Sequence, residues 1–418
     1  MNLRLHGCFL LSALLMTPVL AQDEAAVGRL LMLAFTGAEP PLEQLGSLRP
    51  GGFIFFSRNA PSAAAVQEIT RGLQDAAGYP LIFAVDQEGG PFSSFRAPEA
   101  TLFPGNMALA AAGDLELARR AALASAQELA FAGFTMSFAP VVDVNSNPDN
   151  PIIGVRSFGA DVDAVSLFGR ATLEGLEAAG VAGVAKHFPG HGDTAVDSHL
   201  ALPSVTGDRA RLDSVELPPF EALVEAGVPA VMTAHVAFLA LEADVPATLS
   251  ERALTELLRG ELAFDGLIIT DYMDMKAVAD HYGPGEAAVR SIVAGADLVL
   301  LGPDRAVQGE VHEALVEAVR SGRISEVRVQ DALARVERVA KRYRPGWERA
   351  TSDPTSDPTS DPAPDYAAHR ALAREVATRG ATLLWNDGVL PLDSAADVLV
   401  VAPRPSLFGE PPHLGTVL

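Results

Sequence analysis

The chain has 418 residues, of which 49% are hydrophobic and 20% are charged. This composition fits one large globular domain accompanied by a smaller segment. The formal net charge is −22 at pH 7, which argues against nucleic acid or an anionic membrane surface as a partner.

The first 21 residues have the pattern of a secretory signal peptide. Arg4 precedes an apolar core from Phe9 to Leu20, and Val19-Leu20-Ala21 is a small-residue cleavage site. The core is too short to span a bilayer permanently, so no stable membrane insertion is expected. The sequence therefore predicts a protein exported to the periplasm or the cell exterior. Cleavage would remove Cys8, the only cysteine, so stability would come from packing without a disulfide.

Residues 22–346 alternate between short apolar runs and amphipathic helical stretches. Eight runs are predicted as strands, at 30–35, 52–56, 81–85, 135–142, 181–185, 230–233, 267–270 and 298–301. Helices are predicted between them, as at 63–76, 115–132, 164–179, 252–262 and 306–320. This alternation indicates an α/β protein with a (β/α)₈ TIM barrel. A doubly wound open sheet is the alternative, but no GxGxxG fingerprint follows the first strand.

The barrel region is followed by a linker and a short α/β segment. Thr-Ser-Asp-Pro is repeated three times within residues 347–365, and such a polar, proline-rich stretch favours an extended chain. Residues 366–418 resemble a truncated α/β unit, with a helix at 367–379 and a strand at 398–401. Because every candidate site residue precedes the linker, residues after Ala350 are expected to be dispensable for chemistry.

Polar residues end or closely follow the apolar runs from the third to the seventh. They are Asp86, Asp143, Lys186, His187, His235 and Asp271. A barrel enzyme builds its site at the carboxyl ends of its strands, so these side chains are expected to share one mouth. The densest stretch, Lys186–Thr194, is broken by proline and glycine and is expected to be a loop.

Asp271 is the best candidate for a nucleophile. It follows the apolar run Leu267–Thr270, so a rigid strand would hold its carboxylate at the mouth of the barrel. A carboxylate there can attack an anomeric carbon and form a covalent glycosyl-enzyme. The alternative is a capping role at the next helix, expected at 273–279, for which Asp274 is equally suited.

His199 is the best candidate for an acid/base, with Asp197 two residues before it. The carboxylate could hold one imidazole nitrogen and leave the other for proton transfer, although a surface pair without a role is the alternative. The nearby histidines and aspartates could also suggest a metal site. No known metal-ligand spacing is present, so neither a metal nor a cofactor is expected.

At these residues the chain resembles glycoside hydrolase family 3, in its β-N-acetylglucosaminidase branch. The similarity covers about residues 24–345 and is carried by several motifs in order. They are Asp86-Gln87-Glu88-Gly89-Gly90, Phe103-Pro104-Gly105-Asn106-Met107-Ala108, Ala139–Asn145, Asn150–Gly159, Lys186–Asp193, Asp197-Ser198-His199 and Ile269-Thr270-Asp271. The Asp-Ser-His element resembles the acid/base dyad of this branch, which the family's β-glucosidases lack.

The resemblance implies a role for each matching residue. Asp271 would be the nucleophile, His199 the acid/base and Asp197 its orienting partner. The sugar-binding residues that it implies are Asp86, Arg156, Lys186 and His187, together with Arg96. Arg96 arrives about two residues late in its motif, because Pro91–Phe95 intervenes. Residues from about 367 resemble the start of the family's second domain.

The expected function is that of a retaining exo-β-N-acetylglucosaminidase. Its carbohydrate substrate would be peptidoglycan fragments or chitooligosaccharides bearing a terminal N-acetylglucosamine. One alternative is a β-glucosidase or β-xylosidase of the same family, against which the Asp-Ser-His element argues. The other is a non-catalytic sugar-binding derivative, suggested by the altered Pro91–Phe95 segment and the short C-terminal segment.

Overall fold

A computed structural model describes residues 24–196, 202–348 and 363–383. The predicted signal peptide, Asp197, His199, most of the linker and the predicted strand at 398–401 lie outside the described residues. No helix within the described ranges is long and apolar enough to cross a membrane.

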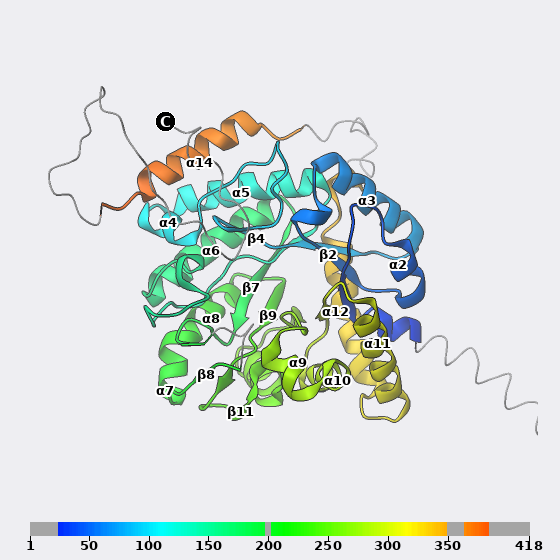
Figure 1. Ribbon diagram of the computed structural model, residues 1–418. Coiled ribbons are helices and arrows are strands. Elements are labelled where there is room, and N and C mark those ends of the chain that lie inside the picture. The colour runs from blue at the N-terminus through cyan, green and yellow to red at the C-terminus, as the bar shows by residue number, and fades with distance from the viewer. Residues whose placement is uncertain (1–23, 197–201, 349–362, 384–418) are drawn as a thin grey trace, which may run out of the picture. The chain divides into compact units, whose positions relative to one another are not determined.

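Eight parallel strands form a barrel whose order follows the chain (Figure 1). They are β1 (Leu31–Ala34), β2 (Gly52–Phe55), β3 (Ile82–Val85), β6 (Met136–Ser137), β7 (Ala182–Phe188), β9 (Ala230–Thr233), β12 (Leu267–Ile269) and β13 (Val299–Leu301). β1 pairs with β13, and a parallel bridge from Ile269 to Leu298 joins the remaining neighbours. This closure confirms the predicted TIM barrel and excludes the open sheet.

Helices surround the barrel at the predicted places. The larger ones are α2 (Leu42–Leu48), α3 (Ala63–Ala77), α5 (Leu115–Ala132), α6 (Val162–Ala178), α8 (Pro218–Glu225), η5 (Arg252–Glu261), α9 (Lys276–Tyr282), α10 (Pro284–Ala294), α11 (Arg305–Arg320) and α12 (Glu326–Arg342). Side chains of Ser62, Asp114, Asp161, Asp304 and Ser325 cap five of them by accepting from backbone N–H groups of the first turn.

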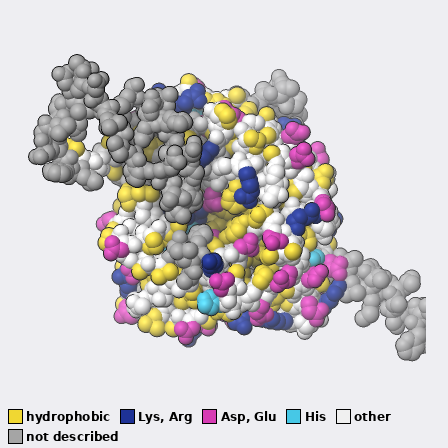
Figure 2. Space-filling view, in the orientation of Figure 1, with side chains coloured by type: hydrophobic (Ala, Val, Ile, Leu, Met, Phe, Trp, Pro, Cys, Tyr) yellow, Lys and Arg dark blue, Asp and Glu magenta, His cyan; other side chains and the backbone are white. Residues whose placement is uncertain are grey.

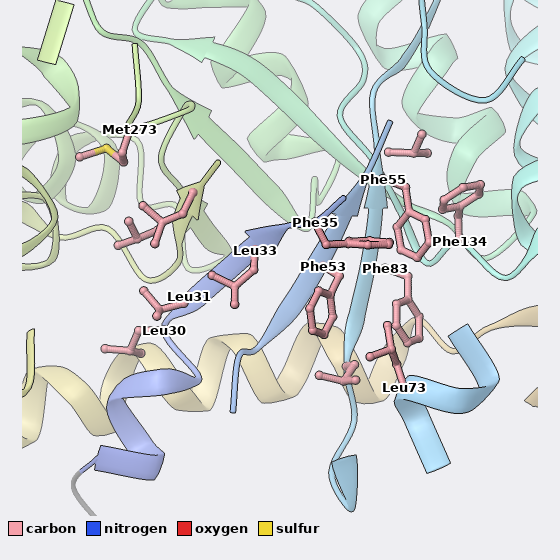
Figure 3. Close-up of a cluster of buried hydrophobic side chains, with 14 of the residues drawn as sticks. Leu30, Leu31, Leu33, Phe35, Phe53, Phe55, Leu73, Phe83, Phe134 and Met273 are labelled. Carbon is pink, nitrogen blue, oxygen red and sulfur yellow. The ribbon is translucent and has the colours of Figure 1, made fainter. Parts of the chain in front are cut away.

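Alternation along the strands separates two layers of the core. Met32 and Ile54 belong to the cluster that fills the barrel interior, whereas their neighbours Leu31, Phe53 and Phe55 face the helices. Figure 3 shows the outer cluster, in which the ring of Phe35 meets that of Phe55 edge to face, with 5.0 Å between centroids. The packed interior leaves the chemistry to the strand ends and loops.

Two strands differ from their predicted bounds. β7 continues through Phe188, so Lys186 and His187 lie on the strand and not in the predicted loop. Conversely, β6 covers only two residues of the predicted 135–142. Pro140 has no N–H to donate and interrupts the ladder, which Val141 resumes by an isolated bridge to Lys186. The polar residues of β7 are therefore held more rigidly than a loop would hold them.

Short elements lie beyond the barrel strands. The hairpin of β4 (Gln87–Gly89) and β5 (Phe92–Ser93) follows β3, and α4 (Asn106–Ala111) comes next. β8 (Ser204–Val205), β10 (Ala237–Phe238) and β11 (Glu242–Pro246) form a small second sheet. The shortest helical turns are η1 (Ser57–Asn59), η2 (Gly154–Arg156), α7 (Arg209–Arg211), η3 (Leu212–Glu216) and η4 (Ala247–Leu249).

The predicted helix at 367–379 is present as α14 (Tyr366–Gly380). It belongs to the same compact unit as the barrel, and a second unit begins at Ala381. Three residues of that second unit, 381–383, are described, and they are neither helix nor strand.

The carboxylate of Asp297, shortly before β13, offers a test of what stabilises the barrel. Asp297 is fully buried and accepts from Arg259 at 2.6 Å, Arg328 at 2.7 Å and the Ile268 N–H at 3.0 Å. Replacing it leaves the half-buried Arg259 without its carboxylate and the buried Ile268 N–H without this acceptor, so Asp297→Ala should lower the free energy of unfolding by about 3 kcal/mol. Asp331→Ala, at an exposed partner of Arg328, should cost about 1 kcal/mol or less. Urea denaturation measures both, and equal losses would contradict this account.

Candidate active site

The polar residues that end the strands converge at one mouth of the barrel, as predicted. Lys186 Nζ on β7 lies 2.8 Å from Asp86 Oδ1, which follows β3. His187 Nδ1 lies 2.8 Å from Asp143 Oδ2, which follows β6. His235, after β9, lies 3.0 Å through Nε2 from the carbonyl oxygen of Tyr272, the residue after Asp271.

Glu88 is the centre of a buried ion cluster. Its Oε1 lies 2.6 Å from Lys186 Nζ, and both of its oxygens accept from the Arg156 guanidinium at 2.8 Å. Burial would raise the pKa of Glu88, but the charges and hydrogen bonds of Arg156 and Lys186 outweigh it and lower the pKa to about 2. The carboxyl is therefore ionised at every physiological pH.

The sequence analysis gave Glu88 no role, although it lies in the motif Asp86–Gly90. Charge balance could have identified it, because two buried cations, Lys186 and Arg156, need two carboxylates and Asp86 supplies only one. Asp86 has a side chain that is 31% exposed, against 2% for Lys186 and 3% for Glu88. Asp86 is thus the member of the cluster whose carboxylate reaches the solvent and can accept from hydroxyl groups of a bound molecule.

Asp143 holds the two histidines of the β7 segment. Its Oδ1 accepts from the backbone N–H groups of His187 at 3.1 Å and His191 at 2.8 Å. Burial would raise the pKa of Asp143, but the neighbouring histidines lower it. A carboxylate only accepts and a guanidinium only donates. A neutral His187 therefore carries its proton on Nδ1 and offers Nε2 to Arg156, at 3.3 Å.

His191, whose backbone N–H is bound to Asp143, is almost fully buried. Its Nδ1 lies 2.8 Å from the Thr194 hydroxyl, while Asn150 donates to its carbonyl oxygen at 2.8 Å. Burial and the nearby His187 lower the pKa of His191 to about 4. His191 is therefore neutral near pH 7 and supports the loop without exchanging protons there.

Asp271 stands at the end of β12, half-buried, with Oδ1 accepting from the Tyr272 N–H at 2.7 Å. Burial would raise its pKa, but the charge that His187, His235 and Lys186 can carry lowers it. Asp271 is therefore ionised at neutral pH. The capping alternative is wrong, because α9 begins at Lys276 instead of 273 and has Met275 at its N-cap position.

Two aromatic residues border the mouth. The Arg156 guanidinium lies over the Phe92 ring at 4.6 Å, which holds the β4–β5 hairpin against the ion cluster. The ring of Tyr272 meets that of Phe56, after β2, edge to face at 6.2 Å. Figure 2 shows hydrophobic side chains gathered near the centre of this face, with acidic side chains spread around them.

Arg96 lies on the hairpin side of the site. Its guanidinium donates to the carbonyl oxygens of Ser93 and Pro91, each at 2.6 Å, and to that of Gly90 at 3.4 Å. These bonds brace the turn of the hairpin, and the sugar-binding role of Arg96 stays a prediction. No group of three or more His, Cys, Asp or Glu among the described residues is arranged to hold a metal ion.

Residues 24–339 match the model of the glycosyl hydrolase family 3 N-terminal domain. The chain belongs to glycosyl hydrolase family 3. It is 35% identical over 405 residues to Beta-hexosaminidase A of Pseudoalteromonas piscicida, covering 90% of this chain and 66% of that relative. The chain thus spans slightly less than two thirds of that protein's length.

Solved structures of the family have the same fold. A family 3 β-N-acetylglucosaminidase from Paenibacillus sp. str. FPU-7 is 41% identical with a TM-score of 0.79, over 85% of this chain and 68% of that one. A β-N-acetylhexosaminidase from Beutenbergia cavernae DSM 12333 is 29% identical with a TM-score of 0.70, over 76% of this chain and 98% of that one. These similarities confirm the family resemblance and its hexosaminidase branch.

The structure thus brings together Asp86, Arg156, Lys186, His187 and Asp271. The predicted dyad of Asp197 and His199 lies outside the described residues and stays a prediction. Glu88 is an addition to the predicted site, whereas Asp143 was expected at the mouth but without a specific role.

The ion cluster predicts a pH dependence of stability. The pKa of Glu88 is lowered from 4.5 to about 2, so its contribution is complete above about pH 5 and is lost as the pH falls toward 2. By linkage the contribution is roughly 3 kcal/mol. Urea denaturation between pH 6 and pH 3 should show a steeper loss of unfolding free energy for the wild type than for Glu88→Gln. Parallel curves would contradict this account.

Proposed function

We propose that this chain is an exported, retaining exo-β-N-acetylglucosaminidase, which releases terminal N-acetylglucosamine from peptidoglycan fragments or chitooligosaccharides. One observation carries the proposal: a fixed carboxylate, Asp271, follows β12 at the barrel mouth where Lys186 and His187 end β7, in a chain whose relatives are named beta-hexosaminidase. Export would follow removal of residues 1–21. N-terminal sequencing of the protein recovered outside the cytoplasm tests this, and a retained Met1 would contradict it.

In the first step, Asp271 attacks the anomeric carbon and forms a covalent glycosyl-enzyme, while the leaving oxygen receives a proton. The lowered pKa of Asp271 suits this role, because only the carboxylate form is nucleophilic. The strand β12 and the bond from the Tyr272 N–H fix the carboxylate in place before substrate arrives.

The proton is assigned to His199, with Asp197 orienting its ring. In the second step the same imidazole accepts a proton from water, whose oxygen bonds to the anomeric carbon as the bond to the Asp271 carboxylate breaks, and the sugar is released. Imidazole titrates near neutrality without needing burial to raise its pKa, so it can replace the second carboxylate of most glycosidases.

The sugar itself would be held by the ion cluster. Asp86 offers a partly exposed carboxylate that can accept from two hydroxyls, and Lys186 can donate to an oxygen beside it. Arg156 and His187 would complete the pocket. A neutral cluster of fixed donors and acceptors suits an uncharged sugar, which is bound by directional hydrogen bonds.

A panel of nitrophenyl sugars separates this proposal from its alternatives. The N-acetylglucosaminide should be cleaved much faster than the glucoside or xyloside, and a preference for the glucoside would favour the β-glucosidase alternative. A chain stabilised against heat by N-acetylglucosamine, yet without turnover, would be the non-catalytic derivative.

The nucleophile is tested by substitution and trapping. Asp271→Ala should leave the fold intact and lower kcat by about 10⁴-fold or more, the scale expected for removal of a covalent nucleophile. An activated fluoro-sugar should leave an adduct that peptide mass spectrometry places on Asp271. The half-buried Asp274 is the matched control, and Asp274→Ala should lower kcat less than about tenfold. An adduct on Asp274 or Asp143 would refute the assignment.

The acid/base is tested by the leaving group. Positioned proton transfer typically contributes about 10²–10⁴-fold, and a nitrophenolate leaves readily without it. His199→Ala should therefore impair cleavage of natural disaccharides far more than glycosylation by nitrophenyl-GlcNAc, with a burst of nitrophenol before slow turnover. Asp197→Ala should show a milder form of the same pattern. Equal losses on both substrates without a burst would mean that His199 only shapes the site.

A further inference from the structure

Helix α14 packs directly on the segments that build the sugar-binding side of the mouth. Figure 1 shows it running alongside α4 and α5. Its residues Leu372, Ala373 and Val376 are buried in the same hydrophobic cluster as Phe103 and Leu109. The helix is therefore part of the core on this side of the barrel, although the linker separates it from the rest in sequence.

Gly380 shows how closely the helix approaches α4. A Cβ added at Gly380 would lie 2.4 Å from the carbonyl oxygen of Ala108, a distance that real side chains essentially never show. The end of α14 therefore rests on the backbone of α4 and fixes its position. Any side chain at Gly380 would have to push α4 away.

Hydrogen bonds at both ends of the backbone segment Thr101–Phe103 link the other end of α14 to the β4–β5 hairpin. His369 Nδ1 lies 2.8 Å from Glu128 Oε1 on α5, and Glu128 Oε2 accepts from the Thr101 N–H at 2.8 Å. Two residues later, the Phe103 carbonyl accepts from the Gly90 N–H at 2.8 Å. Gly90 is in the turn of the hairpin that carries Glu88.

α4 itself reaches the ion cluster. Asn106, its first residue, donates from Nδ2 to the Arg156 carbonyl oxygen at 2.6 Å. Arg156 in turn forms the two-bond contact with Glu88 and lies over the Phe92 ring. α14 thus contacts α4, which binds Arg156, and contacts Glu128, which is connected to the β4–β5 hairpin. Both sets of contacts lead to the ion cluster of Glu88, Lys186 and Arg156.

We infer that α14 positions Arg156 and the β4–β5 hairpin for sugar binding, with His369 and Glu128 as positioning residues. The inference rests on the proposed function of this site as a sugar pocket. It reverses the expectation that residues after Ala350 are dispensable, because the contacts of α14 reach residues that hold the pocket together. A misplacement of about 1 Å in such a site can cost about 10²-fold in rate.

The test measures the affinity of the full-length protein for N-acetylglucosamine by titration calorimetry. His369→Ala and Gly380→Ala should each weaken binding about tenfold. Arg379 lies on the same helix, and Arg379→Ala removes only exposed ion pairs, with Asp114 before α5 and with Glu375, so it should leave the affinity unchanged. His369→Asn, whose amide can still donate near the Nδ1 position, should restore most of the affinity. Unchanged affinity in His369→Ala and Gly380→Ala would overturn the inference.

Affinity distinguishes positioning from stability. A helix that only stabilised the fold would change the melting temperature, while the folded molecules would bind the sugar with the wild-type dissociation constant. A double variant, Gly380→Ala with Asn106→Ala, should lose less affinity than the product of the two single effects, because both act through Arg156. Fully multiplicative losses would overturn the route through α4. A wild type that neither binds nor cleaves the sugar would instead refute the proposed function.

Discussion

The site depends on the pairing of Glu88 with Lys186 and Arg156. A buried carboxylate between two buried cations is stable only when every charge is matched and hydrogen-bonded. The three residues come from the β4 hairpin, the strand β7 and the turn η2, so this pairing ties three separate segments to one point. Because Lys186 also holds Asp86, the same pairing presents the one partly exposed carboxylate of the cluster to the mouth.

Asp143 is a second buried carboxylate that ties segments of the site together. By accepting from the ring of His187 and from the backbone of His187 and His191, it orders the end of β7 and selects one tautomer of His187. The charges that His187, His235 and Lys186 can carry, together with the Tyr272 N–H, then lower the pKa of Asp271 despite its burial. The proposed nucleophile and the proposed binding residues are thus coupled electrostatically, so that the site is organised before any ligand arrives.

Residues that do not belong to the ion cluster also hold Arg156 in place. Phe92 lies over Arg156, Asn106 holds its backbone and α14 packs on α4, so that successive layers restrict the same guanidinium. Such support is what a sugar pocket requires, since binding by hydrogen bonds is lost when donors and acceptors shift by a fraction of an ångström. It also explains why a helix beyond the linker can matter to a site on the barrel.

The sequence by itself determined the barrel, the approximate strands and the polar residues at their ends, because alternation of apolar and polar residues is a local property. It also singled out Asp86, Lys186, His187 and Asp271. Only the tertiary structure decided that Glu88 is the common partner of Lys186 and Arg156, that Arg96 binds its own hairpin and that α14 rests on α4. Those contacts join residues such as Glu88 and Arg156, 68 positions apart, and pairing of that kind depends on how the chain folds back on itself.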